Sequence, residues 1–201
     1  MDDVRVGLIT GNTLHEASDV LAHAFRQDPL WIYFIPEEED RLRLSRISFR
    51  MLIRYTMRCG CAHCVEPMKG VALWLPSDKS DMSLLDEIRC GGLSVLINFG
   101  SASLRRMTSA DSFMFKLRKE HLPRRHWYLS LLGVAPGEQG RGYASLLMRH
   151  MIEKLEEERL PAYLDTQNAR NVSIYESFGF RVIDQRVIPA TSVTHWSMIR
   201  E

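Results

Sequence analysis

The stretch Leu129-Ser-Leu-Leu-Gly-Val-Ala-Pro-Gly-Glu-Gln-Gly-Arg-Gly-Tyr-Ala-Ser-Leu-Leu-Met148 predicts a strand, a glycine turn and a helix in succession. Its apolar beginning, Leu129 to Val134, is typical of a mostly buried strand, which Pro136 and Gly137 end. From Ala144 to Leu155, apolar side chains recur at three- and four-residue steps. That spacing indicates a helix with one face on a sheet and the other in water.

The glycine turn, Gly140 to Gly142, is suited to binding an anion. Glycine lets the backbone approach a ligand closely, because it carries no Cβ atom. The first N–H groups of the following helix have no intrahelical acceptor, and they lie at the positive end of the helix dipole. We therefore expect a phosphate group to bind at the start of this helix.

Two general phosphate-binding motifs fit the turn less well. A P-loop needs a lysine and a hydroxyl residue after its second glycine, and Tyr143 and Ala144 stand there instead. The dinucleotide-binding motif GxGxxG agrees with more of the sequence than the P-loop does. The turn follows a strand, opens a helix and precedes Asp165 at the end of the next strand. However, Ser145 replaces its third glycine, and only one such unit occurs. The dinucleotide interpretation is kept as an alternative.

A third interpretation rests on two motifs. The segment Val134-x-Pro136-x-x-Gln139-Gly140-x-Gly142-x-Ala144 resembles the acyl-CoA pyrophosphate loop of the GCN5-related N-acetyltransferase (GNAT) superfamily, whose pattern is Gln/Arg-x-x-Gly-x-Gly/Ala. Downstream, Tyr163 to Phe180 resembles the later strand and helix of the same superfamily, ending in Tyr175-Glu-Ser-Phe-Gly179-Phe180. The helical segment before Trp127 and the motifs Tyr163-Leu-Asp-Thr and Ala169-Arg-Asn most resemble puromycin N-acetyltransferase-like members.

This resemblance implies an α/β GNAT fold in a single domain over residues 1–201. The expected architecture is a mixed, mostly antiparallel sheet flanked by helices, with a splay between strands 4 and 5 and a helical insertion before strand 4. Strands are expected at about 4–9, 61–66, 70–75, 127–134, 162–166, 180–188 and 193–200. Helices are expected at about 13–25, 39–57, 141–159 and 168–178 and within 82–122, whereas 30–36 is assigned to no element.

The resemblance also implies acetyl-CoA as the cofactor. The residues expected to bind it are Leu132, Gly133, Val134, Gln139, Gly140, Arg141, Gly142, Tyr143, Ala144, Ser145, Asn171, Ser173 and Tyr175. Two of them are expected to be catalytic. The N–H of Val134 would lie near the thioester oxygen, and the phenol of Tyr175 would protonate the departing thiolate.

The general base is left open by the sequence, because strand 4 carries no carboxylate. Asp165, His126, Glu120 and His121 are candidates, and an amine that arrives neutral would need none of them. Asp165 is also a candidate partner for an ammonium group on the acceptor.

The expected reaction is direct transfer of an acetyl group, within a ternary complex, to a primary amine of a small molecule. Trp31, Tyr33, Trp74 and Trp127 are candidate acceptor-binding residues, although aromatic side chains at such positions also serve as core. The alternatives are acetylation of protein N-termini or lysines, and a non-catalytic acyl-CoA sensor. The helical segment 82–122 favours a small acceptor, because it would cover the site.

Composition limits the other partners and the location. The 201 residues are 45% hydrophobic and 25% charged, with a formal net charge of +1, so no long-range charge attracts nucleic acid or an anionic membrane. Apolar runs are too short to span a bilayer, and Met-Asp-Asp-Val-Arg lacks a leader pattern, which suggests a cytoplasmic protein. A monomer or a homodimer is expected.

Three of the four cysteines are crowded into Cys59-Gly-Cys61-Ala-His63-Cys64, and the fourth is Cys90. Three thiols and an imidazole are zinc-ligand types. A hexapeptide in a strand, however, directs alternate side chains to opposite faces, so we expect reduced thiols and no metal site.

Overall fold

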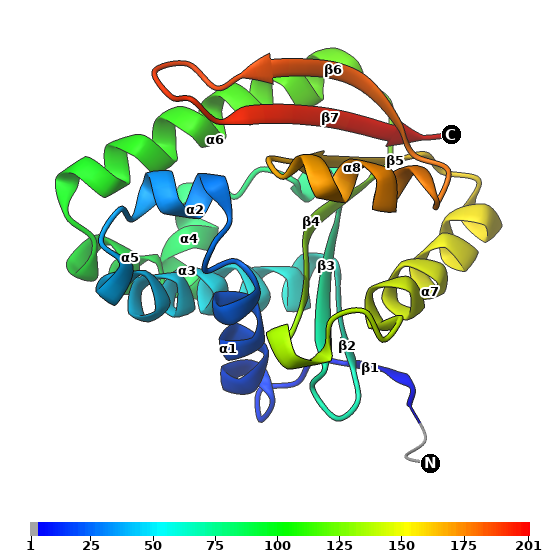
Figure 1. Cartoon of the computed structure of the whole chain (residues 1–201), viewed down its shortest axis with the longest axis horizontal. Helices are drawn as coiled ribbons and strands as arrows, with labels where there is room; N and C mark the ends of the chain where they lie inside the picture. The colour runs from blue at the N-terminus through cyan, green and yellow to red at the C-terminus, as the bar shows by residue number, and fades with distance from the viewer. Residues whose placement is uncertain (1–3) are drawn as a thin grey trace.

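A seven-stranded mixed sheet forms the centre of the computed structural model, which describes residues 4–201 (Figure 1). The strands run in the order β1-β2-β3-β4-β5-β7-β6. Only β4 and β5 pair in parallel; every other neighbouring pair is antiparallel, which confirms the expected fold class. The strands are β1 (Val6–Leu8), β2 (Cys61–Val65), β3 (Gly70–Pro76), β4 (Trp127–Val134), β5 (Ala162–Thr166), β6 (Arg181–Val187) and β7 (Thr194–Arg200).

Helices flank both faces of the sheet (Figure 1). The first core cluster joins one face to α1 (Leu14–Ala24), α2 (Pro29–Phe34), α3 (Glu38–Cys59) and α6 (Ser101–His121). The second joins the other face to α7 (Tyr143–Glu158) and α8 (Ala169–Glu176). The amphipathic pattern of α7 explains its position, since Leu147, Met148 and Met151 are fully buried whereas the opposite face is in water.

The short helix α2 was not expected from the sequence. It forms because Asp28 caps it: the carboxylate accepts hydrogen bonds from the N–H groups of Leu30 and Trp31, at 2.9 and 3.3 Å. Pro29 occupies the first helical position, where its missing N–H costs nothing. The cap therefore fixes both the helix and the carboxylate of Asp28.

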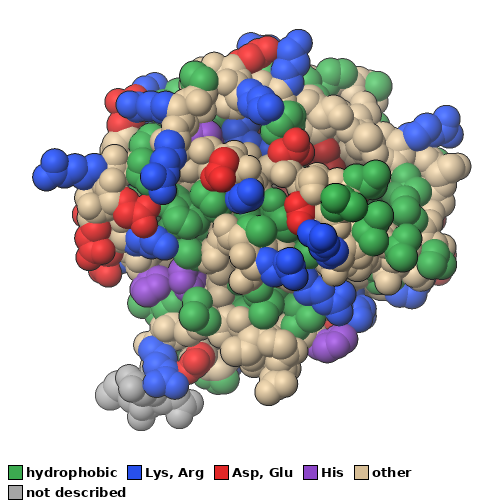
Figure 2. Space-filling view, turned by 180° about the vertical axis from the view of Figure 1, so that it is seen from behind, with side chains coloured by type: hydrophobic (Ala, Val, Ile, Leu, Met, Phe, Trp, Pro, Cys, Tyr) green, Lys and Arg blue, Asp and Glu red, His purple; other side chains and the backbone are tan. Residues whose placement is uncertain are grey.

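The expected helical insertion before β4 is confirmed and comprises α4 (Leu84–Cys90), α5 (Gly92–Asn98) and α6. Gly91, at a φ of 108°, ends α4 in a left-handed conformation. Cys90, Val95 and Phe99 anchor the insertion in the core. Its outer side exposes apolar side chains, which gather on one side of the molecule in Figure 2: Leu84, Leu85, Ile88, Leu93, Leu96 and Ile97.

A bulge interrupts the pairing of β3 with β4. Leu73 lies opposite Leu131 but Trp74 lies opposite Leu129, so Ser130 is the extra residue of β4. The bulge shifts the alternation of side chains between the two faces. Leu129 therefore packs beneath α7, and Leu131 packs in the other core cluster.

The two parallel strands diverge after three residue pairs. Their ladder joins Trp127 to Ala162 and ends with Leu129 opposite Leu164. Beyond that point β5 follows β7, to which it remains paired as far as Thr166, while β4 follows β3 as far as Val134. This divergence confirms the expected splay between strands 4 and 5.

Two further expectations concern membrane-spanning segments and a leader sequence. Among residues 4–201, no helix is long and apolar enough to cross a membrane. The expectation of no leader falls in part on Met1–Asp3, which lie outside the described residues.

Gly133 lets α1 approach β4 closely, which yields a stability prediction. A Cβ atom at this position would lie 2.9 Å from Leu21 and 3.1 Å from the Cβ of Ala24. Gly133→Ala should lower the free energy of unfolding by about 1–3 kcal/mol in urea titrations, because the packed helix must move. Gly137→Ala is the matched control, since a Cβ atom there would meet nothing within 4 Å and its effect should stay within about 0.5 kcal/mol. Equal losses in both variants would contradict this packing.

Candidate active site

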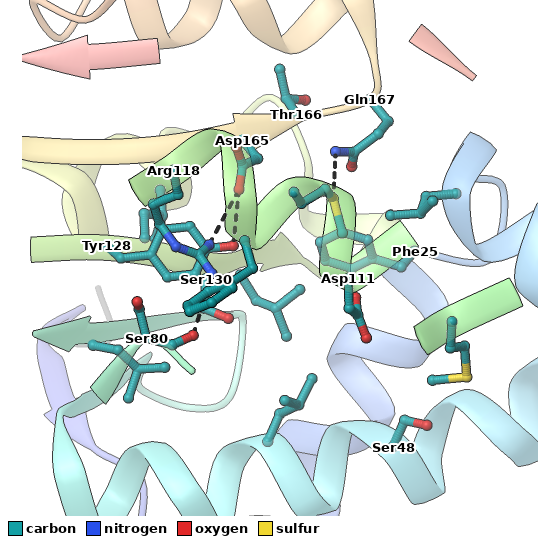
Figure 3. Close-up of a pocket in the computed structure, with 18 of the residues that line it drawn as sticks. Phe25, Ser48, Ser80, Asp111, Arg118, Tyr128, Ser130, Asp165, Thr166 and Gln167 are labelled. Carbon is teal, nitrogen blue, oxygen red and sulfur yellow. Dashed lines mark hydrogen bonds and ion pairs between the residues drawn. The ribbon is translucent and has the colours of Figure 1, made fainter. Parts of the chain in front are cut away.

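A cavity of about 320 Å³ lies where β4 and β5 diverge (Figure 3). Side chains and backbone from both strands line it, together with residues of α2, α3, α6 and α8. Its volume is at the lower end of the range for sites that bind small molecules. The cavity is therefore large enough for a compact ligand, and the helical insertion forms one of its walls.

The diverging side of β4 offers two backbone donors. The N–H of Ala135 donates a hydrogen bond to the carbonyl of Lys69. This bond establishes which N–H groups of β4 point toward β3. In an antiparallel pair, successive residues point their N–H groups to opposite sides, so those of Leu132 and Val134 face away from β3. Within the described residues, no strand pairs with that side of β4 beyond Leu129. An extended ligand could pair with this edge as an added strand does.

The glycine turn has the geometry that the sequence predicts. Gly140 and Gly142 have φ values of 77° and 84°, which glycine adopts without strain. Gly142 precedes the first turn of α7 and makes no side-chain cap. The N–H groups of Tyr143, Ala144 and Ser145 thus have no intrahelical acceptor and can hydrogen-bond an anion.

Charged side chains beside the turn add a positive surplus. Glu138 lies 2.6 Å from the ammonium of Lys69 and 3.0 Å from the guanidinium of Arg141. The hydrogen bond from Lys69 is the main reason why the pKa of Glu138 lies below its usual value. Two cations here face one carboxylate. Lys69, on the turn between β2 and β3, was not predicted, because only the fold brings it to this loop.

The loop side chain of Gln139 also reaches β4. Its amide nitrogen lies 3.3 Å from the carbonyl oxygen of Val134, to which it donates a hydrogen bond. This contact ties the glycine turn to the open strand edge. Gln139 therefore positions backbone in addition to lying within the expected pyrophosphate loop.

The residues of α8 that were expected to bind the cofactor differ in their position relative to the cavity. Tyr175 and Asn171 line the cavity, whereas Ser173 is exposed and its hydroxyl donates a hydrogen bond to the carbonyl of Arg170. The phenol of Tyr175 has no hydrogen-bond partner within residues 4–201, and its ring packs edge-on against Phe180. Burial, and then the nearby charge of Asp28, raise the pKa of Tyr175. The phenol therefore keeps its proton and remains available as a donor.

Asp165 lies at the cavity but is already paired. Its carboxylate lies 3.2 Å from the hydroxyl of Tyr128 and 3.5 Å from the guanidinium of Arg118 (Figure 3). It also lies 3.1 Å from Nε2 of His195. Although burial opposes ionisation, the hydrogen bond from His195 and the Arg118 charge hold the pKa of Asp165 below its usual value. A paired carboxylate of low pKa is a poor base near neutral pH.

Two other carboxylates in the cavity were not singled out from the sequence. Burial raises the pKa of Asp28 to about 6, against the lowering effect of the α2 N–H groups. Asp111, on α6, is open to the cavity, but the surrounding protein raises its pKa to about 7. The signal for Asp28 was its place before Pro29, which also indicates a helix cap. Nothing in the sequence of α6 distinguishes Asp111 from a solvated aspartate.

The remaining candidate bases lie outside the cavity. His126 is buried with its Nδ1 atom 2.8 Å from the carbonyl oxygen of Arg124, and burial lowers its pKa. His121 pairs with Asp184, and Glu120 lies 3.9 Å from Lys116 on the exposed side of α6.

The four aromatic residues that were candidates for binding the acceptor lie in different parts of the structure. Trp31 lines the cavity, whereas Tyr33, whose ring contacts that of Phe34, does not line it. Trp74 and Trp127 belong to the core beneath α7, because the alternation of β3 and β4 directs them to that face. The structure therefore brings only Trp31 of this group to the cavity.

The cysteines alternate across the sheet as expected. Cys64 belongs to the first core cluster, and Cys61 packs against the second. Within the described part of the chain, no group of three or more His, Cys, Asp or Glu side chains has the geometry of a metal site.

Comparison with known proteins is consistent with this site. Residues 100–180 match the model of the acetyltransferase (GNAT) family. The chain is 27% identical over 177 residues to an uncharacterized N-acetyltransferase of Schizosaccharomyces pombe, covering 82% of this chain and 69% of that protein.

Solved structures share the fold. A protein of Corynebacterium glutamicum, described as histone acetyltransferase HPA2 and related acetyltransferase, is 20% identical, with a TM-score of 0.68 and coverage of 98% and 95% of the two chains. A polyamine N-acetyltransferase of Drosophila melanogaster, which forms N-acetylagmatine, is 13% identical, with a TM-score of 0.58 and coverage of 98% and 99%. The chain has the GNAT fold and is similar to GNAT acetyltransferases over residues 100–180, and it is an N-acetyltransferase whose acetyl donor is acetyl-CoA.

Proposed function

We propose that this protein, as a single domain over residues 1–201, transfers the acetyl group directly to a primary amine of a small molecule within a ternary complex. One observation carries the proposal: the open edge of β4 leads to a cavity of about 320 Å³ that the helical insertion covers. A cavity of this size, partly covered by the insertion, admits a small amine more readily than a polypeptide chain.

The residues that would hold acetyl-CoA are those with unpaired donors at this edge. The N–H groups of Tyr143, Ala144 and Ser145 would bind the pyrophosphate, with Arg141 and Lys69 contributing positive charge. The N–H groups of Leu132 and Val134 would pair with the extended arm, and Asn171 faces the cavity from α8. Bound there, acetyl-CoA supplies the acetyl group as a thioester.

The backbone of β4 and the phenol of Tyr175 account for two of the required chemical tasks. An N–H group of β4 on the open side would stabilise the oxygen charge that develops during acyl transfer. We retain Val134 for this role, with Leu132 as the second donor on the same side. Tyr175 would provide the proton for the leaving sulfur, because it lines the cavity and its hydroxyl has no other partner within the described chain.

We propose Asp28 as the general base. Its carboxylate lines the same cavity as Tyr175 and is close enough to raise the pKa of that phenol. The α2 N–H groups hold the carboxylate in place, and its own pKa of about 6 suits proton transfer near neutral pH. Asp165 is better suited to a structural role, since Arg118 and His195 already pair with it.

Two alternatives remain as competing proposals. The Corynebacterium protein carries the description of a histone acetyltransferase, which would favour a protein lysine or N-terminus as acceptor. The Drosophila protein forms N-acetylagmatine, which favours a small amine, as does the small, partly covered cavity here. A non-catalytic acyl-CoA sensor would not need the unpaired Tyr175 phenol. Membership of the puromycin N-acetyltransferase-like subgroup remains a proposal on its sequence motifs.

Tyr175→Phe tests the proposed acid. Thiol release with acetyl-CoA and a panel of primary amines should fall about 100-fold or more in kcat, because proton donation is lost. The KM for acetyl-CoA should change little, since the ring remains. Tyr33→Phe is the control and should behave as the wild type, because Tyr33 lies outside the cavity. Unchanged kcat in Tyr175→Phe would overturn the assignment.

Asp28→Asn tests the proposed base, because asparagine retains the helix cap while removing the titrating group. A base accepts a proton only when it is ionised, so wild-type kcat should rise as the pH rises through about 6. The variant should lose this limb and fall at least about 10-fold at pH 7.5. Asp19→Asn, at an exposed position on α1, should preserve the limb. The same limb in Asp28→Asn would exclude this aspartate.

A further inference from the structure

The cavity carries more negative than positive charge. Its lining includes five carboxylates and one guanidinium, that of Arg118. Arg118 is committed to Asp165 and to the carbonyl of Ser80, at 3.5 and 3.4 Å, and it stacks 3.9 Å above the ring of Tyr128. The remaining carboxylates are those of Asp28, near Tyr175, and of Asp111, Glu87 and Asp81, contributed by the helical insertion and the loop before it. The insertion side therefore has an uncompensated negative charge.

Asp111 provides the main carboxylate of this negatively charged side of the cavity. Figure 3 shows its side chain leaving α6 and pointing into the cavity. Its carboxylate has no hydrogen-bond or ion-pair partner in residues 4–201. The surrounding protein and the charges of Glu87 and Asp81 raise the pKa of Asp111 to about 7, although the Arg118 charge opposes them. A cation in contact would keep this carboxylate ionised.

An independent observation comes from α3, on the opposite wall. Ser48 is 1% exposed and lines the cavity, and its hydroxyl has no hydrogen-bond partner in the described chain. Apolar side chains of α2 and α3, including Trp31 and Met51, line the same wall. A buried hydroxyl that lacks a partner is unfavourable, so native proteins usually supply one. A ligand with N–H groups would satisfy Ser48.

We propose that the acceptor is a dication and that Asp111 and Ser48 bind its second, non-reacting cationic group. The chemical class is a linear diamine or an aminoalkylguanidine. One amine reaches Tyr175 and Asp28, and the other cationic group donates hydrogen bonds to Asp111 and Ser48. Glu87 and Asp81 add to the attraction. This inference rests on the proposed transfer to a small amine and specifies its substrate.

A matched pair of acceptors tests the inference. We expect wild-type kcat/KM for 1,4-diaminobutane to exceed that for butylamine by roughly 10- to 100-fold, because one more charged hydrogen-bonded contact forms. Asp111→Asn should bring this ratio of kcat/KM values most of the way to one, chiefly by raising the KM for 1,4-diaminobutane. The kcat/KM for butylamine should change less than about twofold. Ser48→Ala should reduce the ratio by a smaller factor. Glu120→Gln, on the exposed side of α6, should leave it unchanged.

Calorimetric titration with acetyl-CoA distinguishes failure of the dication inference from failure of the proposed function. If acetyl-CoA binds and both acceptors react equally well, or if Asp111→Asn lowers both equally, the dication inference is wrong while small-amine transfer stands. If acetyl-CoA binds and neither acceptor reacts, the dication inference is also wrong. If acetyl-CoA does not bind, the proposed function itself fails.

Discussion

The parting of β4 from β5 is the constraint on which the rest of the site depends. The parallel ladder ends at Leu129 because β4 continues along β3, whereas β5 stays with β7. The bulge at Ser130 coincides with the parting, and bulges increase local twist. Backbone donors that a continuous sheet would satisfy are thereby left open on β4. The same parting creates the space that α6 and α8 enclose as a cavity.

Electrostatics then divides the carboxylates of the cavity into two kinds. Asp165 is held by Arg118 and His195, which stabilises the junction of α6 with β5 and removes this residue from acid–base chemistry. Within residues 4–201, neither Asp28 nor Asp111 is paired with a cation. Burial raises the pKa of Asp28 toward neutrality, and the surrounding protein raises that of Asp111, which is open to the cavity. Groups that titrate near neutral pH are suited to exchanging protons with a ligand or to binding its charge. The fold thus separates a structural carboxylate from two available ones.

The sequence predicted what local patterns determine. The glycine turn at 140–142 and the amphipathic α7 each depend on a few neighbouring residues, and the structure has both. The sequence could not predict what depends on contacts between distant segments. The bulge at Ser130 arises from its register against Leu73, and Lys69 reaches Glu138 only in the folded sheet. Asp28 was recognisable as the residue before a proline, but its place in the same cavity as Tyr175 follows from the packing of α2 against α3 and α6. Trp74 and Trp127 were considered for the acceptor site, yet strand alternation buries them beneath α7.

Amide hydrogen exchange by nuclear magnetic resonance, with and without acetyl-CoA, tests the central claim most directly. Acetyl-CoA should slow exchange at Leu132 and Val134 and at the first turn of α7, where N–H groups lack protein acceptors. Exchange at Leu131 and Gly133 should change little, because their N–H groups already face β3. NADH should protect none of these amides. Protection elsewhere in the chain, with Leu132 and Val134 unaffected, would contradict the assignment of the open β4 edge as the acyl-CoA site.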